Sequence, residues 1–137
     1  MRTALDTNVL SALWNNESAA QSVSVLLGEA LQAGSVVLCA VAYLELLARP
    51  QSTEESLQRF LSDTRVVVDF DLSEEVWVEA GRAYRRYAQR RLRSGTGPAE
   101  RLLADFIIGA HAQVMADRLM TLDRGRYERD FPELKLV

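Results

Sequence analysis

Four acidic residues interrupt segments of this 137-residue sequence that are otherwise apolar. They are Asp6 after RTAL, Glu45 inside AVAYLELLA, Asp105 inside LLADFIIGA and Asp123 directly after LMTL. An ionised carboxylate is costly to remove from water, so buried carboxylates are paired with a cation, protonated or bound to a metal. The only lysine is Lys135, and most arginines lie in one polar segment away from these acids. A hard divalent metal such as Mg²⁺ or Mn²⁺, which prefers oxygen ligands, is therefore the most economical interpretation.

The composition predicts one globular domain spanning residues 1–137. Hydrophobic residues make up 48% of the chain and charged residues 26%, which is typical of a domain whose hydrophobic core needs no disulfide bonds or structural metal ions. The single cysteine, Cys39, excludes an internal disulfide and a multi-cysteine zinc site, and its SVVLCA context predicts a buried structural thiol. The single histidine, His111, makes a zinc-hydrolase cluster implausible and is interpreted as a packing residue.

The charge pattern bears on location and on partners. No charged segment followed by an apolar run begins the sequence, and no stretch approaches the ~20 apolar residues of a membrane span, so we expect a soluble, cytoplasmic protein. The net charge of −3 argues against a generally basic nucleic-acid binder, but acids gathered in one metal site would leave a local basic face. Candidate contacts to nucleic-acid phosphates lie in an arginine-rich segment that could equally be a solvated face: Arg82, Arg86, Arg90 and Arg93.

The hydrophobic pattern predicts strands that alternate with helices. The predicted strands cover residues 2–5, 35–39, 65–70, 119–122 and 134–137. The predicted helices cover approximately residues 7–14, 17–33, 41–49, 53–62, 73–93 and 99–116, with Gly34 ending the second and Pro98 preceding the last. This alternation indicates a parallel α/β sheet with helices on both faces.

Such sheets bind ligands beyond the carboxyl ends of their strands, where Asp6 and Asp123 are expected. If the helices that carry Glu45 and Asp105 present those residues to the same edge, the four acids converge on one pocket. Each acid also has an alternative interpretation in which its role is only structural. Asp6 could cap the first helix, Glu45 could lie on a solvated face, and Asp123 could be a turn residue. Asp105 could pair with Arg101 one helical turn earlier.

Five segments of the sequence resemble the PIN-domain family, and more narrowly the VapC-type toxins of toxin–antitoxin pairs. They are LDTN, YLEL, ADFIIGAHA, LMTLDRGRY and FPEL, in that order along nearly the whole chain. The resemblance implies a three-layer α/β fold with a mainly parallel five-stranded sheet between helices. It also implies a Mg²⁺- or Mn²⁺-dependent ribonuclease that forms a homodimer and is held inactive by a small VapB-type antitoxin.

Residue by residue, the resemblance puts the acidic quartet of the family on Asp6, Glu45, Asp105 and Asp123. It puts supporting polar residues on Asn8 and Thr121. We expect Asp6 and Asp105 to hold the principal metal and the other two acids to complete its shell. One metal or two are equally compatible with the sequence.

With no histidine obviously available as a base, the metal would have to generate the nucleophile from water, and cleavage would leave a 5′-phosphate and a 3′-hydroxyl. Three other functions compete with a toxin nuclease. One is a PIN fold that has lost its activity and serves protein interaction, which the intact acidic quartet argues against. Another is a PIN nuclease of RNA processing without an antitoxin. The third is a phospho-signalling domain with an acidic pocket, which needs a lysine near that pocket, where Lys135 is poorly placed.

Overall fold

The computed structural model describes residues 1–97 and 103–137 and is built around a parallel sheet. Its strands are β1 (Arg2–Leu5), β2 (Ser35–Cys39), β3 (Val67–Asp69) and β4 (Arg118–Met120), in the order β3-β2-β1-β4. Each neighbouring pair is parallel. The central strands β1 and β2 are buried from their second residue onward, as expected for a sheet covered on both faces.

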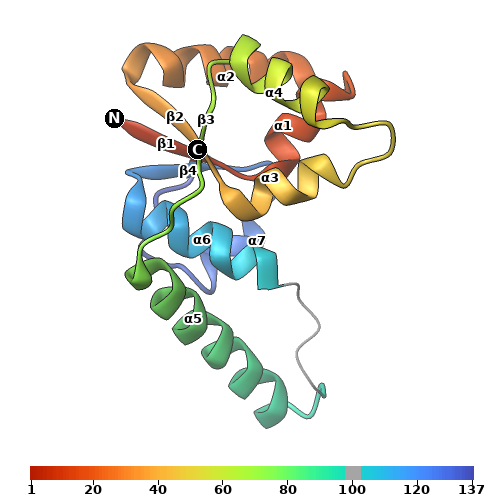
Figure 1. Cartoon of the computed structure of the whole chain (residues 1–137). Coiled ribbons are helices and arrows are strands. Elements are labelled where there is room, and N and C mark those ends of the chain that lie inside the picture. The colour runs from red at the N-terminus through yellow and green to blue at the C-terminus, as the bar shows by residue number, and fades with distance from the viewer. Residues whose placement is uncertain (98–102) are drawn as a thin grey trace.

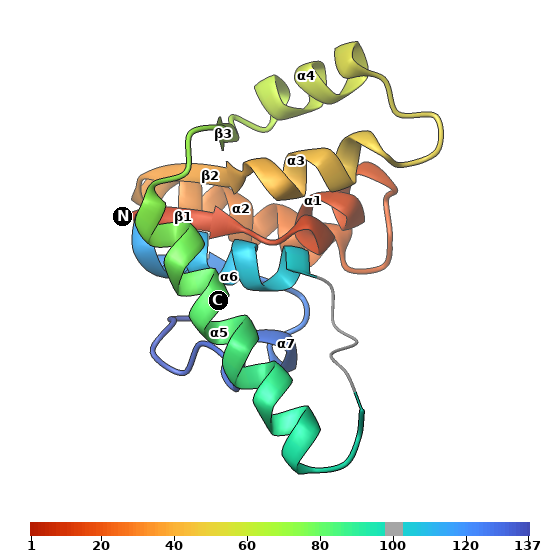
Figure 2. The same cartoon turned by 60° about the horizontal axis from the view of Figure 1, so that its bottom comes forward.

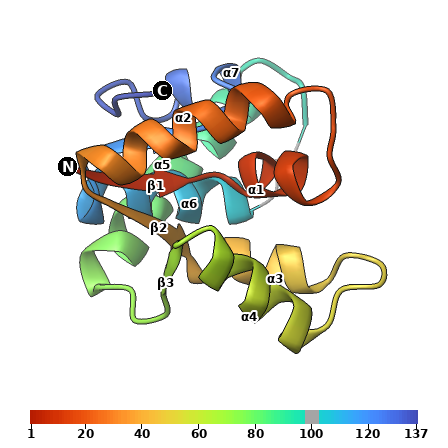
Figure 3. The ribbon, with the colours of Figure 1, turned by 90° about the horizontal axis from the view of Figure 1, so that it is seen from above.

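Helices cover both faces of this sheet. In chain order the described helices are α1 (Thr7–Trp14), α2 (Ala20–Ala33), α3 (Ala40–Leu47), α4 (Glu54–Asp63), α5 (Glu74–Arg93), α6 (Leu103–Met115) and α7 (Gly125–Glu128). Helix α2 lies on one side of the sheet and α6 on the other, with α5 packed outside α6 (Figures 1 and 3). The predicted parallel α/β architecture is therefore confirmed. Among the described residues, no helix combines the length and the apolar character that crossing a membrane requires.

Most predicted helices agree with the structure, and the sequence explains their ends. Thr53 precedes α4 in a capping box, where its side chain accepts a hydrogen bond from the backbone N–H of Ser56 at 3.0 Å. Gly34 follows the last residue of α2, as predicted. The start of the last long helix, predicted at Pro98 and residue 99, lies outside the described residues. Helix α7 was not predicted, because four residues are too few for an apolar period to be visible.

The prediction of a fifth strand over residues 134–137 is wrong. In the part of the chain that the structure describes, this segment forms only one isolated parallel bridge, between Leu119 and Leu136. The N–H of Leu119 donates to the carbonyl of Lys135, and the N–H of Val137 donates back to Leu119, both at 2.9 Å. The preceding residues form turns, so the segment reaches β4 over too few residues to build a ladder. The described sheet has four strands.

Aromatic packing joins α5 to α6. The ring of Phe106 lies 5.2 Å from that of Tyr84 and 5.4 Å from that of Tyr87, measured between centroids. Tyr87 is buried in this contact. The first part of α5 lies against the rest of the molecule, while its last turns project beyond α6 (Figure 2). The last turn of α5, which carries Arg90, Arg91 and Arg93, therefore lies at the outer edge of the fold.

Candidate active site

Asp6 and Thr121 follow two neighbouring strands at the same edge of the sheet. Leu5 pairs with Met120 in the parallel register of β1 and β4, so the next residue of each chain segment leaves the sheet at one level. Asp6 is 1% exposed, and its Oδ2 accepts a hydrogen bond of 2.8 Å from the hydroxyl of Thr121. Asp6 is the N-cap residue of α1, but its side chain makes no capping hydrogen bond to that helix, so capping alone does not account for the buried carboxylate.

Two polar side chains hold the segment that carries Asp123. The Oγ1 of Thr121 accepts a hydrogen bond of 3.0 Å from the backbone N–H of Asp123. The Oδ1 of Asn8 accepts one of 3.2 Å from the N–H of Leu122. Thr121 therefore links the buried Asp6 carboxylate to the backbone of a second acid, while Asn8 ties α1 to the same segment.

Arg126 of α7 bridges two of the candidate acids. Its Nη1 lies 3.4 Å from Oδ1 of Asp105, and its Nη2 lies 3.4 Å from Oδ2 of Asp123. The Asp105 side chain is 15% exposed and that of Asp123 is 50% exposed. Burial by itself lowers the pKa of Arg126, but the carboxylates of Asp105, Asp6 and Asp123 together raise it above its ordinary value. One acid on α6 and one in the segment after β4 thus contact a permanently charged guanidinium, and the charge of Asp6, just after β1, also acts on it.

Tyr127 lies beneath this cluster. It is fully buried, and its hydroxyl faces Asp6 without the geometry of a full hydrogen bond to any described atom. Burial and the charge of Asp6 raise the pKa of Tyr127 well above its ordinary value, so the group keeps its proton. A neutral hydroxyl beside a buried carboxylate is a donor available to Asp6.

Glu45 lies close to this cluster without joining it. Its Oε1 accepts a hydrogen bond of 2.6 Å from the hydroxyl of Thr7, the residue after Asp6. Glu45 is half-buried on α3, so the interpretation as a solvated face does not describe it. The structure thus brings Asp6, Asp105 and Asp123 together around Arg126 and puts Glu45 next to them. The suggested partner of Asp105, Arg101, lies outside the described residues.

These donors suit a hard divalent cation in their chemistry, since all are carboxylate oxygens. As they stand, no three His, Cys, Asp or Glu residues within 1–97 and 103–137 lie close enough together to hold a metal ion. The guanidinium between Asp105 and Asp123 explains the spacing of those two carboxylates, because each contacts a different nitrogen of it. The donor set therefore fits a metal, while its present arrangement fits an arginine.

Comparison with known proteins identifies the family. The family model described as PIN domain matches residues 3–132. The chain is a member of the PIN-domain family. This agrees with the resemblance seen in its motifs, and the family is one of nucleases. No curated protein matches the chain significantly.

Solved structures share the fold of this PIN domain over its full length. VapBC2 from Rickettsia felis, bound to a DNA fragment from its promoter, matches with a TM-score of 0.67 at 19% identity, covering 100% of this chain and 98% of the other. VapBC-1 from nontypeable Haemophilus influenzae gives a TM-score of 0.67 at 21% identity, covering 100% and 97%. FitAcB from Neisseria gonorrhoeae gives 0.66 at 21%, covering 98% and 95%. At these identities the likeness shows the fold.

The arginines predicted to contact RNA have other contacts in this PIN domain. Arg82 pairs with Glu79 at 3.5 Å and is largely exposed. Arg86 donates to the backbone carbonyl of Asp130 at 3.3 Å, and Arg90 forms an ion pair with the buried carboxylate of the same residue. Two of these arginines thus fasten the segment after α7 to α5. The fourth candidate, Arg93, lies near the end of α5.

The single cysteine and the single histidine are structural, as predicted. Cys39 is fully buried at the end of β2, and burial raises the pKa of its thiol to about 11, which leaves it protonated and unreactive. His111 is fully buried on α6, and its Nε2 lies 2.7 Å from Oδ2 of Asp69. Both carboxylate oxygens of Asp69 also accept hydrogen bonds from Nη2 of Arg2, each of 2.7 Å. None of these residues contacts the acid cluster in the described structure.

Sequence reasoning missed Arg126 and Tyr127. Neither interrupts an apolar run, and although both end the segment LMTLDRGRY, neither was given a role there. The available signal was position, since both follow Asp123 within four residues in TLDRGRY. A short turn after a strand brings residues three or four positions later back toward the acid at the start of the turn.

Proposed function

We propose that this PIN domain is a metal-dependent endoribonuclease and the toxin of a VapBC-type toxin–antitoxin pair. The observation that carries the proposal is the convergence of Asp6, Asp105 and Asp123 at the carboxyl edge of the sheet, where open α/β sheets bind ligands. Asp6 is fully buried and hydrogen-bonded, Asp105 and Asp123 contact one guanidinium, and the charge of Asp6 acts on the same group.

In this proposal Asp6 and Asp105 hold a Mg²⁺ or Mn²⁺ ion, with Glu45 and Asp123 completing the acidic shell. When bound, such an ion supplies an activated water and offsets negative charge on the phosphate. The chain's own contribution is orientation. Thr121 fixes one oxygen of Asp6, and Thr7 fixes one oxygen of Glu45. The sole histidine is fully buried against Asp69, so a histidine base has no part in the mechanism.

A basic pocket beside the acids supports RNA as the substrate. A cavity of about 410 Å³ is lined by Tyr87, Arg90, Arg91, Ser94, Thr96, Gly125, Arg129 and Asp130. It reaches the acid cluster at Gly125, where an added Cβ would lie 3.8 Å from Oδ1 of Asp123. Guanidinium and hydroxyl groups are the side chains that contact phosphate oxygens, so we propose that the RNA backbone runs from this pocket to the acids.

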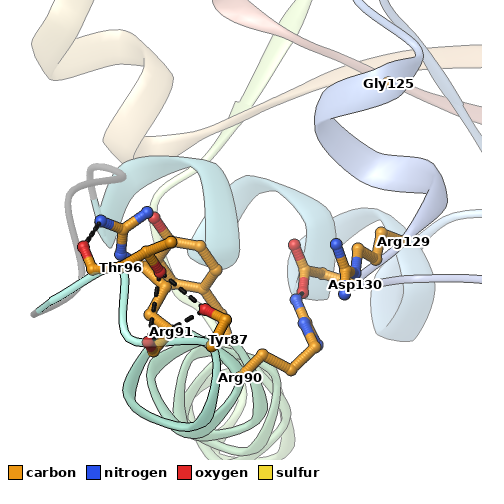
Figure 4. A pocket seen from close by; sticks show the side chains of 8 residues that line it. Tyr87, Arg90, Arg91, Thr96, Gly125, Arg129 and Asp130 are labelled. Atoms are coloured by element: carbon orange, nitrogen blue, oxygen red, sulfur yellow. Dashed lines mark hydrogen bonds and ion pairs between the residues drawn. The ribbon is translucent and has the colours of Figure 1, made fainter.

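The pocket also changes which arginines are proposed to contact RNA. Arg90 points at Asp130, and their opposite charges balance (Figure 4). Arg91 is held by the carbonyl of Thr96 at 2.6 Å and lies over the Tyr87 ring, 6.0 Å from its centroid. Arg129 is exposed at the other side of the pocket. Arg91 and Arg129 are therefore better candidates than Arg82, Arg86 and Arg93.

The proposed VapB-type antitoxin is supported by the structures with the same fold, which were solved as VapBC and FitAcB. The proposed homodimer rests on the family resemblance alone. An antitoxin side chain of Arg or Lys would compete for the acid cluster by charge. A PIN nuclease without an antitoxin would differ in having no short antitoxin gene beside its own. The phospho-signalling alternative has no supporting observation, because Lys135 is exposed on the C-terminal segment beside Leu119 of β4.

The test is cleavage of a pool of structured RNAs by the purified protein in Mg²⁺, Mn²⁺ or EDTA, beside the Asp6→Asn variant. We expect cleavage only with metal and only by the wild-type protein, because Asn removes the charge that Asp6 offers a cation. Equal cleavage by Asp6→Asn would refute the site. Cleavage that persists in EDTA would refute metal dependence.

A further inference from the structure

Arg126 lies where two of the proposed metal ligands meet. Its two terminal nitrogens contact different carboxylates, one on α6 and one after β4, each at 3.4 Å. The charges of Asp105, Asp6 and Asp123 all favour its positive form. The fully buried Tyr127 hydroxyl also faces this cluster without completing a hydrogen bond. The acids are therefore arranged around a cation that belongs to the chain itself.

A guanidinium and a divalent ion cannot both serve this pair of carboxylates. Mg²⁺ takes carboxylate oxygens at about 2.0–2.1 Å, so both carboxylates would have to close on the place that the guanidinium fills. Two cations between the same oxygens also repel each other strongly in a partly buried site. Arg126 is 37% exposed on a short surface helix, so its side chain has a way out to solvent that does not cross the core.

We infer that Arg126 is the resident counter-ion of the metal-free site, and that metal binding requires the displacement of its guanidinium from Asp105 and Asp123. This inference rests on the proposed metal-dependent function. It makes Arg126 a positioning residue that holds the acids apart in the metal-free protein and lowers the affinity of the site for metal. It also explains why the metal-free fold tolerates three neighbouring carboxylates.

Titration of the metal-free protein with Mn²⁺, followed by calorimetry without RNA, tests this inference. Arg126→Met removes the charge but keeps an unbranched side chain, and Arg126→Lys keeps the charge. Arg124→Met is the matched control, because Arg124 lies two residues away, is 57% exposed and pairs with Glu128 at 3.7 Å. Asp6→Asn shows whether the measured binding belongs to the acid cluster.

We expect Arg126→Met to bind Mn²⁺ about tenfold more tightly than the wild-type protein. The wild type must break two partly exposed ion pairs before it binds the metal, and their combined energy corresponds to about this ratio of affinities. Arg126→Lys and Arg124→Met should bind as the wild type does, and Asp6→Asn should not bind. If the wild-type protein binds Mn²⁺ and Arg126→Met binds it with the same or a weaker affinity, the inference is overturned and the proposed function stands. Absence of binding in both proteins at millimolar Mn²⁺ would overturn both.

Thermal unfolding separates this role from a merely structural one. In EDTA, Arg126→Met should unfold at a lower temperature than the wild type, because the acids lose their counter-ion. In Mn²⁺ the order should reverse or the gap should close, because tighter binding to the folded state stabilises it more. The same deficit in EDTA and in Mn²⁺ would mean that Arg126 only packs, and the inference would fail.

Discussion

At the scale of single residues, the site depends on how the buried Asp6 carboxylate is oriented. Thr121 is the side chain that orients it, and the same hydroxyl oxygen receives the N–H of Asp123. One threonine thus sets the relation between two acids from neighbouring strands. Outer hydrogen-bond partners of this kind commonly change metal affinity or activity by about 10- to 100-fold when removed.

Replacement of Thr121 by valine should therefore lower kcat/KM for RNA about 10- to 100-fold while leaving the fold intact, since valine keeps the shape and removes the hydroxyl. Steady-state cleavage rates and far-UV circular dichroism measure the two effects. Thr64→Val is the control, because it removes a hydroxyl that, in the described part of the chain, has no contact with the acids. Thr64 follows the last residue of α4, and its hydroxyl donates to the carbonyl of Phe60 in that helix at 2.8 Å. A Thr121→Val enzyme as active as the control would show that Asp6 needs no such support.

At the scale of elements, α5, α6 and α7 meet so that a basic pocket adjoins the acids. Arg86 and Arg90 of α5 hold Asp130, just beyond α7. The ring of Phe131 packs closely against Gly109 on α6, where an added Cβ would lie only 2.3 Å from the ring. The absence of a side chain there lets the segment after α7 approach α6, which carries Asp105.

The pocket predicts a specific effect of Arg129→Gln on RNA binding. The variant should bind a single-stranded oligonucleotide more weakly in EDTA, and its salt dependence should be shallower by about one unit of log K against log salt, because one phosphate contact is lost. Fluorescence anisotropy at several salt concentrations measures both quantities. Arg82→Gln, exposed on α5 and paired with Glu79, is the matched control. Equal slopes in the two variants would exclude Arg129 from the RNA path.

At the scale of the whole molecule, a second polar cluster ties the sheet to the helical layer. Arg2 of β1 and His111 of α6 both bind Asp69 of β3. Burial opposes ionisation of Asp69, but its bonds to His111 and Arg2 lower its pKa below the ordinary value. Burial lowers the pKa of His111 more than Asp69 raises it, so the imidazole is neutral and donates from Nε2. Its Nδ1 has no described partner, so a second proton there would be buried unpaired.

These shifts predict how the stability depends on pH. The pKa of His111 is lower in the folded protein than in the unfolded chain, so the unfolded state takes up more protons as the pH falls below about 6.5. The free energy of unfolding should therefore fall between about pH 7 and pH 5, whereas the contribution of Asp69 is lost at lower pH, as the pH falls from the ordinary pKa of 3.8 through the lowered pKa of this carboxyl. Urea unfolding at several pH values measures this.

The control is His111→Gln, whose amide nitrogen can replace Nε2 toward Asp69 but does not titrate. Its free energy of unfolding should vary less than that of the wild type over the same range of pH. Identical pH profiles for the two proteins would show that another group is responsible.

Much of the site was predictable because it lies at strand ends. Asp6 and Asp123 follow apolar strands, and in a parallel sheet such ends share one edge. Asp105 was visible as a charge inside an apolar helix. Arg126 and Tyr127 gave no such signal, because an arginine or a tyrosine after a turn is ordinary in any sequence. The contact of Arg90 with Asp130 gave no signal either, since the two residues lie 40 positions apart in the chain.

The sequence by itself determined the class of fold, the order of its main elements and the three acids at the edge of the sheet. Local periodicity and the cost of burying charge depend on neighbours along the chain, so they can be derived from it. Only the tertiary structure decided that the last segment does not complete a fifth strand, that Glu45 lies beside the cluster and that a guanidinium fills its centre. Those outcomes depend on contacts between distant residues, which no local pattern specifies.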